Sequence, residues 1–217
     1  MNKTFRLAAG LFAAFLMWTA AVCRIDLQPI GPQGSAVGLA RLNGAFHRLT
    51  GVHMGLYTVT DWLGLVPLCL VFGFGMLGLV QWIGRKDIRR VDRSLLILGG
   101  FYVTVLAAFL FFERAVVNYR PVLIDGCLEA SYPSSTTLLV MCVMPTAILQ
   151  LDSRIRRPAV RQCLRLLLVG FMIFMVTARL LSGVHWLSDI IGGALLSAGL
   201  VMLYRGAVEC RSIDRRK

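Results

Sequence analysis

The chain has 217 residues, of which 57% are hydrophobic and 16% are charged, and its formal net charge is +12. A soluble domain of this size would carry about 25% charged residues, so the composition excludes an ordinary soluble globular protein. It favours an integral membrane protein that forms a single membrane-embedded domain over residues 1–217.

Six apolar segments approach or reach the roughly 20 residues that a transmembrane helix needs. In chain order they cover residues 7–22, 63–83, 94–112, 134–151, 164–181 and 186–204. They predict an all-α polytopic fold, a bundle of six transmembrane helices. Residues 24–61 form the longest non-spanning stretch, in which Val37, Leu39, Leu42, Phe46 and Leu49 recur at the spacing of a short interfacial helix.

The second segment carries two further signals. Gly73, Gly75 and Gly78 lie inside it and predict a close approach to another helix. Asp61 lies just before it, together with Trp62, and is interpreted as a helix cap beside an interfacial tryptophan.

The basic residues indicate how the chain is oriented. If the N-terminus is cytoplasmic, 17 of the 23 lysines and arginines lie on the cytoplasmic side, as the positive-inside rule requires. Both termini are then cytoplasmic, and segments 113–133 and 179–189 face the outside of a plasma membrane. The positive charge therefore indicates topology and contact with lipid headgroups, not nucleic-acid binding.

Two alternatives concern processing and the cysteines. Residues 7–22 could be a secretory signal peptide, but the cleavage site at Thr19-Ala20-Ala21 is poor, which favours a retained first helix. The six cysteines show no metal-binding spacing. Cys23 and Cys127 would both lie outside, where a disulfide is chemically permitted, but the sequence gives no distance to test it.

The most informative stretch runs from Arg179 through Ser182-Gly183 and His185 to Asp189. It places a guanidinium, an imidazole and a carboxylate between two apolar segments, where charges are costly and usually functional or paired. His185 and Asp189 are four residues apart, a spacing that puts both on one face of a helix and lets the carboxylate hold the imidazole. A nucleophile, its orienting group and an anion ligand would then meet, as phosphoryl transfer requires.

Two more segments are expected on the same side of the membrane. One is Arg120-Pro121, and the other is Pro133-Ser134-Ser135-Thr136 at the start of the fourth apolar segment. A proline followed by hydroxyl residues is typical of a helix start, and free N–H groups at helix N-termini attract anions. In motif order, spacing and the surrounding six segments, the chain resembles the type-2 phosphatidic acid phosphatase superfamily.

The resemblance implies an integral membrane lipid phosphatase that acts on the extracytoplasmic face through a phosphohistidine, without a metal or other cofactor. His185 would be the nucleophile, and Asp189 would orient and stabilise it. The phosphate would be held by Arg120, Arg179, Ser134 and Ser135. The Thr136 hydroxyl could join this site, although Ser135 and Thr136 could also only cap the helix.

The chain departs from the family pattern at two positions. The family's general-acid histidine is replaced by Thr136, and the lysine of its first motif is replaced by Glu113, so that only the adjacent Arg114 could substitute. General acid catalysis typically contributes 10²–10⁴-fold, or about 3–5 kcal/mol. An alkoxide leaving group, which a monoester substrate releases, needs this help. A diphosphate lipid instead releases a phosphate monoester, whose second pKa is about 6, and this leaving group hardly needs a proton. We therefore expect a preference for diphosphate lipids, such as polyprenyl diphosphates, over monoesters.

Two alternatives to hydrolysis stay open at this point. A catalytically weakened relative would bind or move phospholipids without cleaving them. A phosphotransferase would pass the phosphoryl group from His185 to another lipid instead of to water.

His47 and His53 have no third candidate ligand, which argues against a metal site.

Overall fold

The computed structural model describes residues 3–213, with side chains through Cys210. Some of the basic residues counted on the cytoplasmic side lie outside this part, namely Arg215, Arg216, Lys217 and the side chain of Arg211. Its regular elements are helices, joined by single 3₁₀ turns at Pro32–Gly34 and Ile88–Arg90. The helices are α1 (Lys3–Arg24), α2 (Ala40–Thr50), α3 (Met54–Leu63), α4 (Leu65–Arg85), α5 (Arg93–Arg114), α6 (Ser135–Arg154), α7 (Pro158–Leu181) and α8 (Leu187–Ile213).

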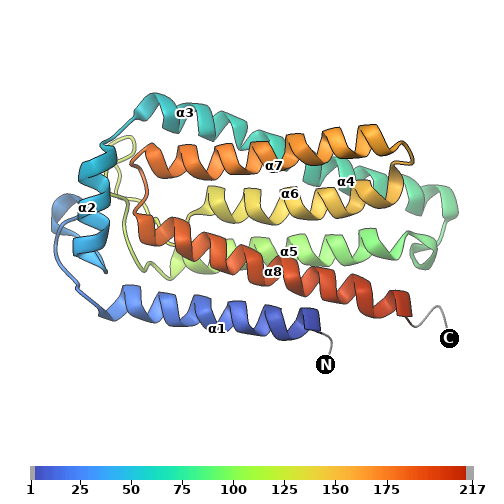
Figure 1. Ribbon diagram of the computed structural model, residues 1–217, viewed down its shortest axis with the longest axis horizontal. Coiled ribbons are helices and arrows are strands. Elements are labelled where there is room, and N and C mark those ends of the chain that lie inside the picture. The colour runs from blue at the N-terminus through green and yellow to red at the C-terminus, as the bar shows by residue number, and fades with distance from the viewer. Residues whose placement is uncertain (1–2, 214–217) are drawn as a thin grey trace.

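The long helices lie side by side in a bundle, and α2 lies across one end of it (Figure 1). Six stretches are long and apolar enough to cross a membrane when α3 and α4 are taken together, which confirms the predicted bundle. We call the end that carries α2 and segments 115–134 and 182–186 the loop end. The other, where α1 begins and α8 stops, is the terminal end (Figure 1).

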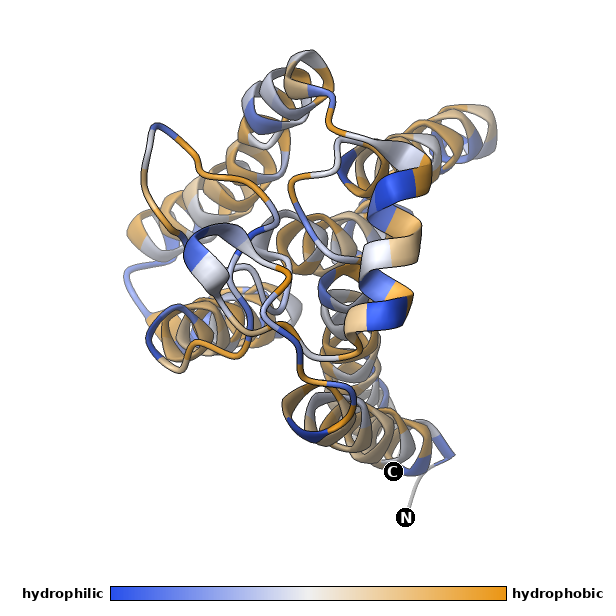
Figure 2. Ribbon diagram, turned by 90° about the vertical axis from the view of Figure 1, so that its left-hand side faces the viewer, coloured by the Kyte–Doolittle hydropathy of each residue, from blue (hydrophilic) through white to orange (hydrophobic). Residues whose placement is uncertain are grey.

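Helices α6 and α8 form the centre of the bundle. In their most apolar stretches 50% and 61% of residues are buried, against at most 22% in the other spans. The outer helices instead expose leucine, phenylalanine and valine side chains, which suits contact with lipid tails. Seen from the loop end, apolar residues dominate the long helices and polar residues gather in α2 and the loops (Figure 2).

The second span differs from its prediction. The non-spanning stretch expected to reach Asp61 ends at Met54, because α3 packs against α7 and leads through Gly64 into α4. The expected close approach at Gly73, Gly75 and Gly78 is wrong for the described residues, since a Cβ added there would have no atom within 4 Å. Gly75 and Gly78 instead line a cavity of about 310 Å³ together with Gly99 of α5.

Helix α8 shows the close packing that α4 lacks. A Cβ at Gly192 would lie 2.6 Å from the Tyr132 ring, and one at Gly199 would lie 3.1 Å from the Phe12 ring. Helix α1 runs along α8, and the Trp18 indole Nε1 donates to the Ser188 carbonyl (3.0 Å). The contacts of Phe12 and Trp18 join α1 to α8, whose first turn ends segment 179–189, the third of the three motifs.

The other expectations for the loop end hold in part. The predicted interfacial helix is α2, which begins at Ala40, so that Val37 and Leu39 precede it. Cys23 and Cys127 are both free thiols.

Candidate active site

The segment between α5 and α6 folds back on itself at the loop end. Tyr119 and Ala130 pair as an antiparallel bridge, and the Arg120 amide donates to the Glu129 carbonyl (3.0 Å). The two side chains of this second pair also meet, with Arg120 Nε 2.9 Å from Glu129 Oε2. The bridge therefore fixes Arg120 at the base of a two-stranded loop, and its side chain is almost fully buried.

The start of α6 is joined to the third motif. The Ser134 hydroxyl accepts from the Thr137 amide (3.4 Å) and caps the helix, while the Ser134 amide donates to the Asp189 carbonyl (3.1 Å). The first amides of a helix have no intrahelical acceptor, and their positive end favours an anion. The α6 N-terminus thus lies beside His185 and Asp189 with its dipole directed at the loop end.

His185 lies before α8 rather than within it. Because α8 begins at Leu187, the expectation that His185 and Asp189 share a helical face is wrong. The chain turns at Gly183 (φ 70°), where a Cβ would lie 2.0 Å from the Gly51 carbonyl oxygen, so only glycine fits. The turn still brings His185 Nδ1 to 3.7 Å from Asp189 Oδ2, a separation longer than a hydrogen bond.

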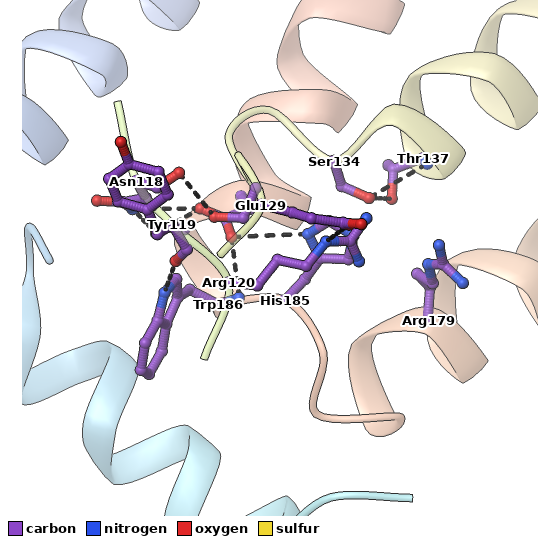
Figure 3. Close-up of polar contacts among 12 residues, drawn as sticks. Asn118, Tyr119, Arg120, Glu129, Ser134, Thr137, Arg179, His185 and Trp186 are labelled. Atoms are coloured by element: carbon purple, nitrogen blue, oxygen red, sulfur yellow. Dashed lines mark hydrogen bonds and ion pairs between the residues drawn. The ribbon is translucent and has the colours of Figure 1, made fainter. Parts of the chain in front are cut away.

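The environment of His185 keeps its imidazole neutral. Burial lowers the pKa of His185 from 6.5 to about 4; Asp189 opposes this shift and Arg120 adds to it. Arg120 Nη1 lies 3.3 Å from Nε2, and because a guanidinium can only donate, Nε2 accepts. The proton is therefore assigned to Nδ1, facing Asp189, and Nε2 carries the lone pair that a nucleophile needs. Figure 3 shows the contact between Arg120 and His185.

The Asp189 carboxylate is held by several donors. The Trp186 amide donates to Oδ2 (3.0 Å) and the Asn118 amide group donates to Oδ1 (3.2 Å). Asn43 of α2 bonds both the hydroxyl (2.9 Å) and the backbone amide (3.0 Å) of Ser188. Helix α2 and the first motif thus fix the carboxylate that faces the imidazole.

Arg179 is oriented by α3. Its Nη1 donates to Thr60 Oγ1 (3.1 Å), its Nη2 lies 3.6 Å from Asp61 Oδ1, and its guanidinium stacks 4.6 Å from the Tyr57 ring. Asp61 lies in the last turn of α3 and pairs with Arg179, so its interpretation as a cap of the second span is wrong. The same Tyr57 ring lies 6.0 Å from the Arg120 guanidinium, so both arginines are near one aromatic ring.

Two cavities meet at the start of α6. A small one of about 40 Å³ is lined by His185, Arg120, Glu129, Glu113 and Ser135. A larger, mainly apolar one of about 630 Å³ is lined by Asp61, Thr136 and Ser135 at its polar part and by leucines and valines elsewhere. Ser135 lines both, so the N-terminus of α6 separates a polar pocket from a cavity that suits lipid chains.

Comparisons with known proteins show the family and the fold of this chain. The sequence pattern of the PAP2 superfamily matches residues 96–211, more than half of the chain and all three motifs. The chain belongs to the PAP2 superfamily. No curated protein sequence matches it. Its fold is similar to the crystal structure of the first transmembrane PAP2 type phosphatidylglycerolphosphate phosphatase from Bacillus subtilis, with a TM-score of 0.65 and 20% identity over 93% of this chain and 96% of that one.

The residues expected from the PAP2 motifs are not all in one place. Arg120, His185, Asp189 and the α6 N-terminus are in contact, and Arg179 reaches the same region through Tyr57. Arg114 is exposed at the end of α5 and lines neither cavity, although Glu113 lines the small one. The Ser134 hydroxyl accepts from Thr137, whereas Ser135 and Thr136 line the cavities.

Four residues near the site were not foreseen as functional: Tyr57, Asp61, Asn118 and Glu129. A carboxylate beside an apolar span is itself a functional signal, so the sequence could have marked Asp61. Asn118 stands two residues before Arg120, but its contact with Asp189 depends on the fold of segment 115–134. Within the described residues, no three His, Cys, Asp or Glu side chains are grouped to hold a metal.

Proposed function

We propose that this PAP2 protein is an integral membrane lipid phosphatase that hydrolyses a lipid phosphate or diphosphate through a phosphohistidine at His185. The observation that carries the proposal is the neutral, buried imidazole whose Nε2 accepts from Arg120 while its Nδ1 faces Asp189. This arrangement directs the Nε2 lone pair at Arg120, so that Nε2 can attack phosphorus once a phosphate takes over the Arg120 hydrogen bond.

The chemistry follows from these contacts. The Nε2 lone pair attacks phosphorus, the bond to the leaving oxygen breaks, and the leaving group departs with the electron pair. The imidazolium that forms is stabilised by the Asp189 carboxylate, which Asn118 and the Trp186 amide hold in place. Arg120, Arg179 and the α6 N-terminus stabilise the charge on the phosphoryl oxygens.

The large cavity supports a lipid as substrate. Its apolar walls come from α4, α5 and α6, and Ser135 connects it to the pocket of His185. A lipid whose headgroup lies at Ser135 would therefore place its chains in the large cavity. Since Thr136 stands where the family has its acid, we infer that diphosphates, whose leaving group needs no proton, are cleaved faster than monoesters.

The charge distribution supports an extracytoplasmic site in the plasma membrane. The loop end, which carries the site, also has the fewer lysines and arginines, and both termini would be cytoplasmic. Release of phosphate to the outside is therefore part of the proposal.

The function is tested with purified protein in proteoliposomes. Phosphate release from a polyprenyl diphosphate and from phosphatidate is measured for the unchanged protein and for His185→Gln. We expect release that is faster with the diphosphate and lost in the variant. Release that survives the substitution, or faster turnover of the monoester, would contradict the proposal.

Sidedness is tested in the same vesicles, by comparing intact vesicles with permeabilised ones after the protein's orientation has been determined by protease accessibility. Substrate must be cleaved from the side that exposes α2. Cleavage from the side of the termini would show the opposite topology.

A further inference from the structure

The second half of the proposed reaction needs a base that the motifs do not supply. A phosphohistidine is hydrolysed by water, and a positioned base that takes the water's proton typically accelerates such a step 10²–10⁴-fold. The family's proton-transfer position is Thr136, whose hydroxyl is a poor base at neutral pH. Another residue must take this role if hydrolysis is to be efficient.

Two carboxylates are placed beside the phosphate-binding arginines. Glu129 pairs with Arg120 (2.9 Å) and Asp61 pairs with Arg179 (3.6 Å). The Asp61 side chain is 62% exposed, whereas the Arg179 side chain that it contacts is only 3% exposed. Each carboxylate therefore contacts an arginine that would hold the phosphate of the substrate.

The geometry of displacement distinguishes the two. In phosphoryl transfer, the attacking and leaving groups lie roughly in line on opposite sides of phosphorus. Glu129 lines the same small cavity as His185, and its partner Arg120 contacts the nucleophilic Nε2 (Figure 3). Glu129 is therefore on the nucleophile's side of the phosphate, where the incoming water cannot be.

Asp61 lies at the other cavity. It lines the large cavity together with Thr136 and Ser135, and His185 does not line that cavity. A leaving lipid group would move away into this cavity, and water must then approach phosphorus from the same direction. Asp61 and the position of the family's histidine thus open onto the same space.

From this placement we propose that Asp61 is the base of the hydrolytic step, in place of the histidine that Thr136 replaces. The Asp61 carboxylate takes a proton from water as the water oxygen attacks phosphorus. The phosphorus–Nε2 bond breaks, its electron pair returns to His185, and inorganic phosphate is released. The proposal rests on the proposed function, since it requires a phosphohistidine.

The test separates formation of the phosphoenzyme from its decay. Purified protein is mixed with a prenyl diphosphate labelled in its terminal phosphate, quenched at intervals, and assayed for acid-labile label on the protein. For Asp61→Asn we expect formation within about threefold of the unchanged protein, and decay slowed about 100-fold, so that label accumulates. If Asp61 only positions Arg179, formation slows instead and no label accumulates, which would overturn the proposal.

Two further variants sharpen the result. Glu129→Gln removes the matched carboxylate on the other arginine, and we expect a change in formation but no slowing of decay. Asp61→Asn combined with Thr136→His returns a base to the same cavity and should restore decay to within about tenfold of the unchanged protein. Slow decay in Glu129→Gln, or no rescue by the histidine, would assign the base elsewhere.

Failure of the proposed function gives a different outcome. In that case the unchanged protein forms no label that depends on His185, whatever residue is at position 61. Label that forms normally and decays equally fast in Asp61→Asn would leave the phosphatase assignment intact and refute only the role of Asp61.

Discussion

Two polar clusters lie at opposite ends of the bundle, and they differ in how completely their buried groups are paired. At the terminal end, the Gln150 amide donates to the Tyr204 hydroxyl (2.5 Å) and to the Ser94 carbonyl (3.1 Å), and Arg154 donates to the Gln150 side-chain oxygen. Arg154 also pairs with Asp92 (3.6 Å). The side-chain NH2 group and the side-chain oxygen of Gln150 are therefore both hydrogen-bonded, as a structural network requires.

At the loop end, the groups with catalytic potential are only partly satisfied. Arg179 Nε and His185 Nδ1 are buried without a hydrogen-bond partner in the described part of the chain. Buried donors without a partner are costly and rare. Their presence here indicates a site that binds an anion and transfers a proton. The comparison shows that incomplete pairing, more than polarity itself, distinguishes the candidate active site from a polar support.

Replacing His185 should have the largest effect on activity. His185→Gln removes the nucleophile, and we expect phosphate release to fall by about 10³-fold or more. Thermal unfolding should change little, because glutamine retains hydrogen-bonding groups of similar reach. A variant that keeps activity would place the nucleophile elsewhere and remove the distinction between the two clusters.

Asp189→Asn should have the next largest effect. The neutral amide keeps one acceptor oxygen for Asn118 or Trp186 but not both, and it cannot stabilise the imidazolium, so kcat should fall about 10²–10⁴-fold with KM nearly unchanged. Steady-state kinetics would check this split. A rise in KM alone would mean that Asp189 only shapes the pocket.

The substitution Thr136→His tests the inferred substrate preference. A histidine at the cavity that Thr136 lines supplies an acid for alkoxide leaving groups, so monoester hydrolysis should rise by about 10-fold or more and diphosphate hydrolysis should change much less. The ratio of the two kcat/KM values is the measurement. An equal rise for both substrates would show that proton donation is not what Thr136 removed.

The low pKa of His185 predicts the pH dependence. Its folded value of about 4 lies below the ordinary 6.5, so the imidazole stays neutral down to about pH 4, and kcat/KM should begin to fall only near that pH. Stability behaves differently, because between pH 6.5 and about 4 the unfolded state binds more protons than the folded state. The contribution of His185 to stability therefore decreases as pH falls through this window.

Measuring kcat/KM between about pH 3 and pH 8 tests this expectation directly. If the acidic limb of kcat/KM instead has an apparent pKa near 6.5, the imidazole is solvated in the working enzyme, and burial does not keep it neutral.

The smallest effect on activity is expected at the terminal end. Gln150→Leu leaves the Tyr204 hydroxyl and the Ser94 carbonyl without their donor, which should destabilise the fold by about 1–3 kcal/mol. Activity of the folded protein should stay within about twofold, measured as phosphate release below the unfolding temperature. A loss comparable to that of Asp189→Asn would mean that both clusters serve catalysis.

Much of the fold and part of the site could be predicted from sequence because each rests on local signals. Apolar length gave the six spans, and the third motif gave Arg179, His185 and Asp189. What could not be predicted depends on tertiary packing. Asp61 reaches Arg179 because α3 packs on α7, and Asn118 reaches Asp189 because segment 115–134 folds back.

The errors have the same origin. The glycines of α4 suit close packing, but only the neighbouring helices decide how near they come, and in the described structure no atom lies within 4 Å of a Cβ added there. His185 and Asp189 have helical spacing, but the turn at Gly183 delays the start of α8 until Leu187. Their contact survives because the turn, and not the helix, brings them together.

The central claim is that three distant segments form one oxyanion pocket around His185. A crystal structure of the protein with bound vanadate, a mimic of the phosphoryl group in transfer, tests it most directly. We expect vanadium within bonding distance of His185 Nε2 and its oxygens within hydrogen-bond distance of both Arg120 and Arg179. Vanadate bound away from His185, or contacted by only one of the two arginines while the other stays paired with its carboxylate, would contradict the claim.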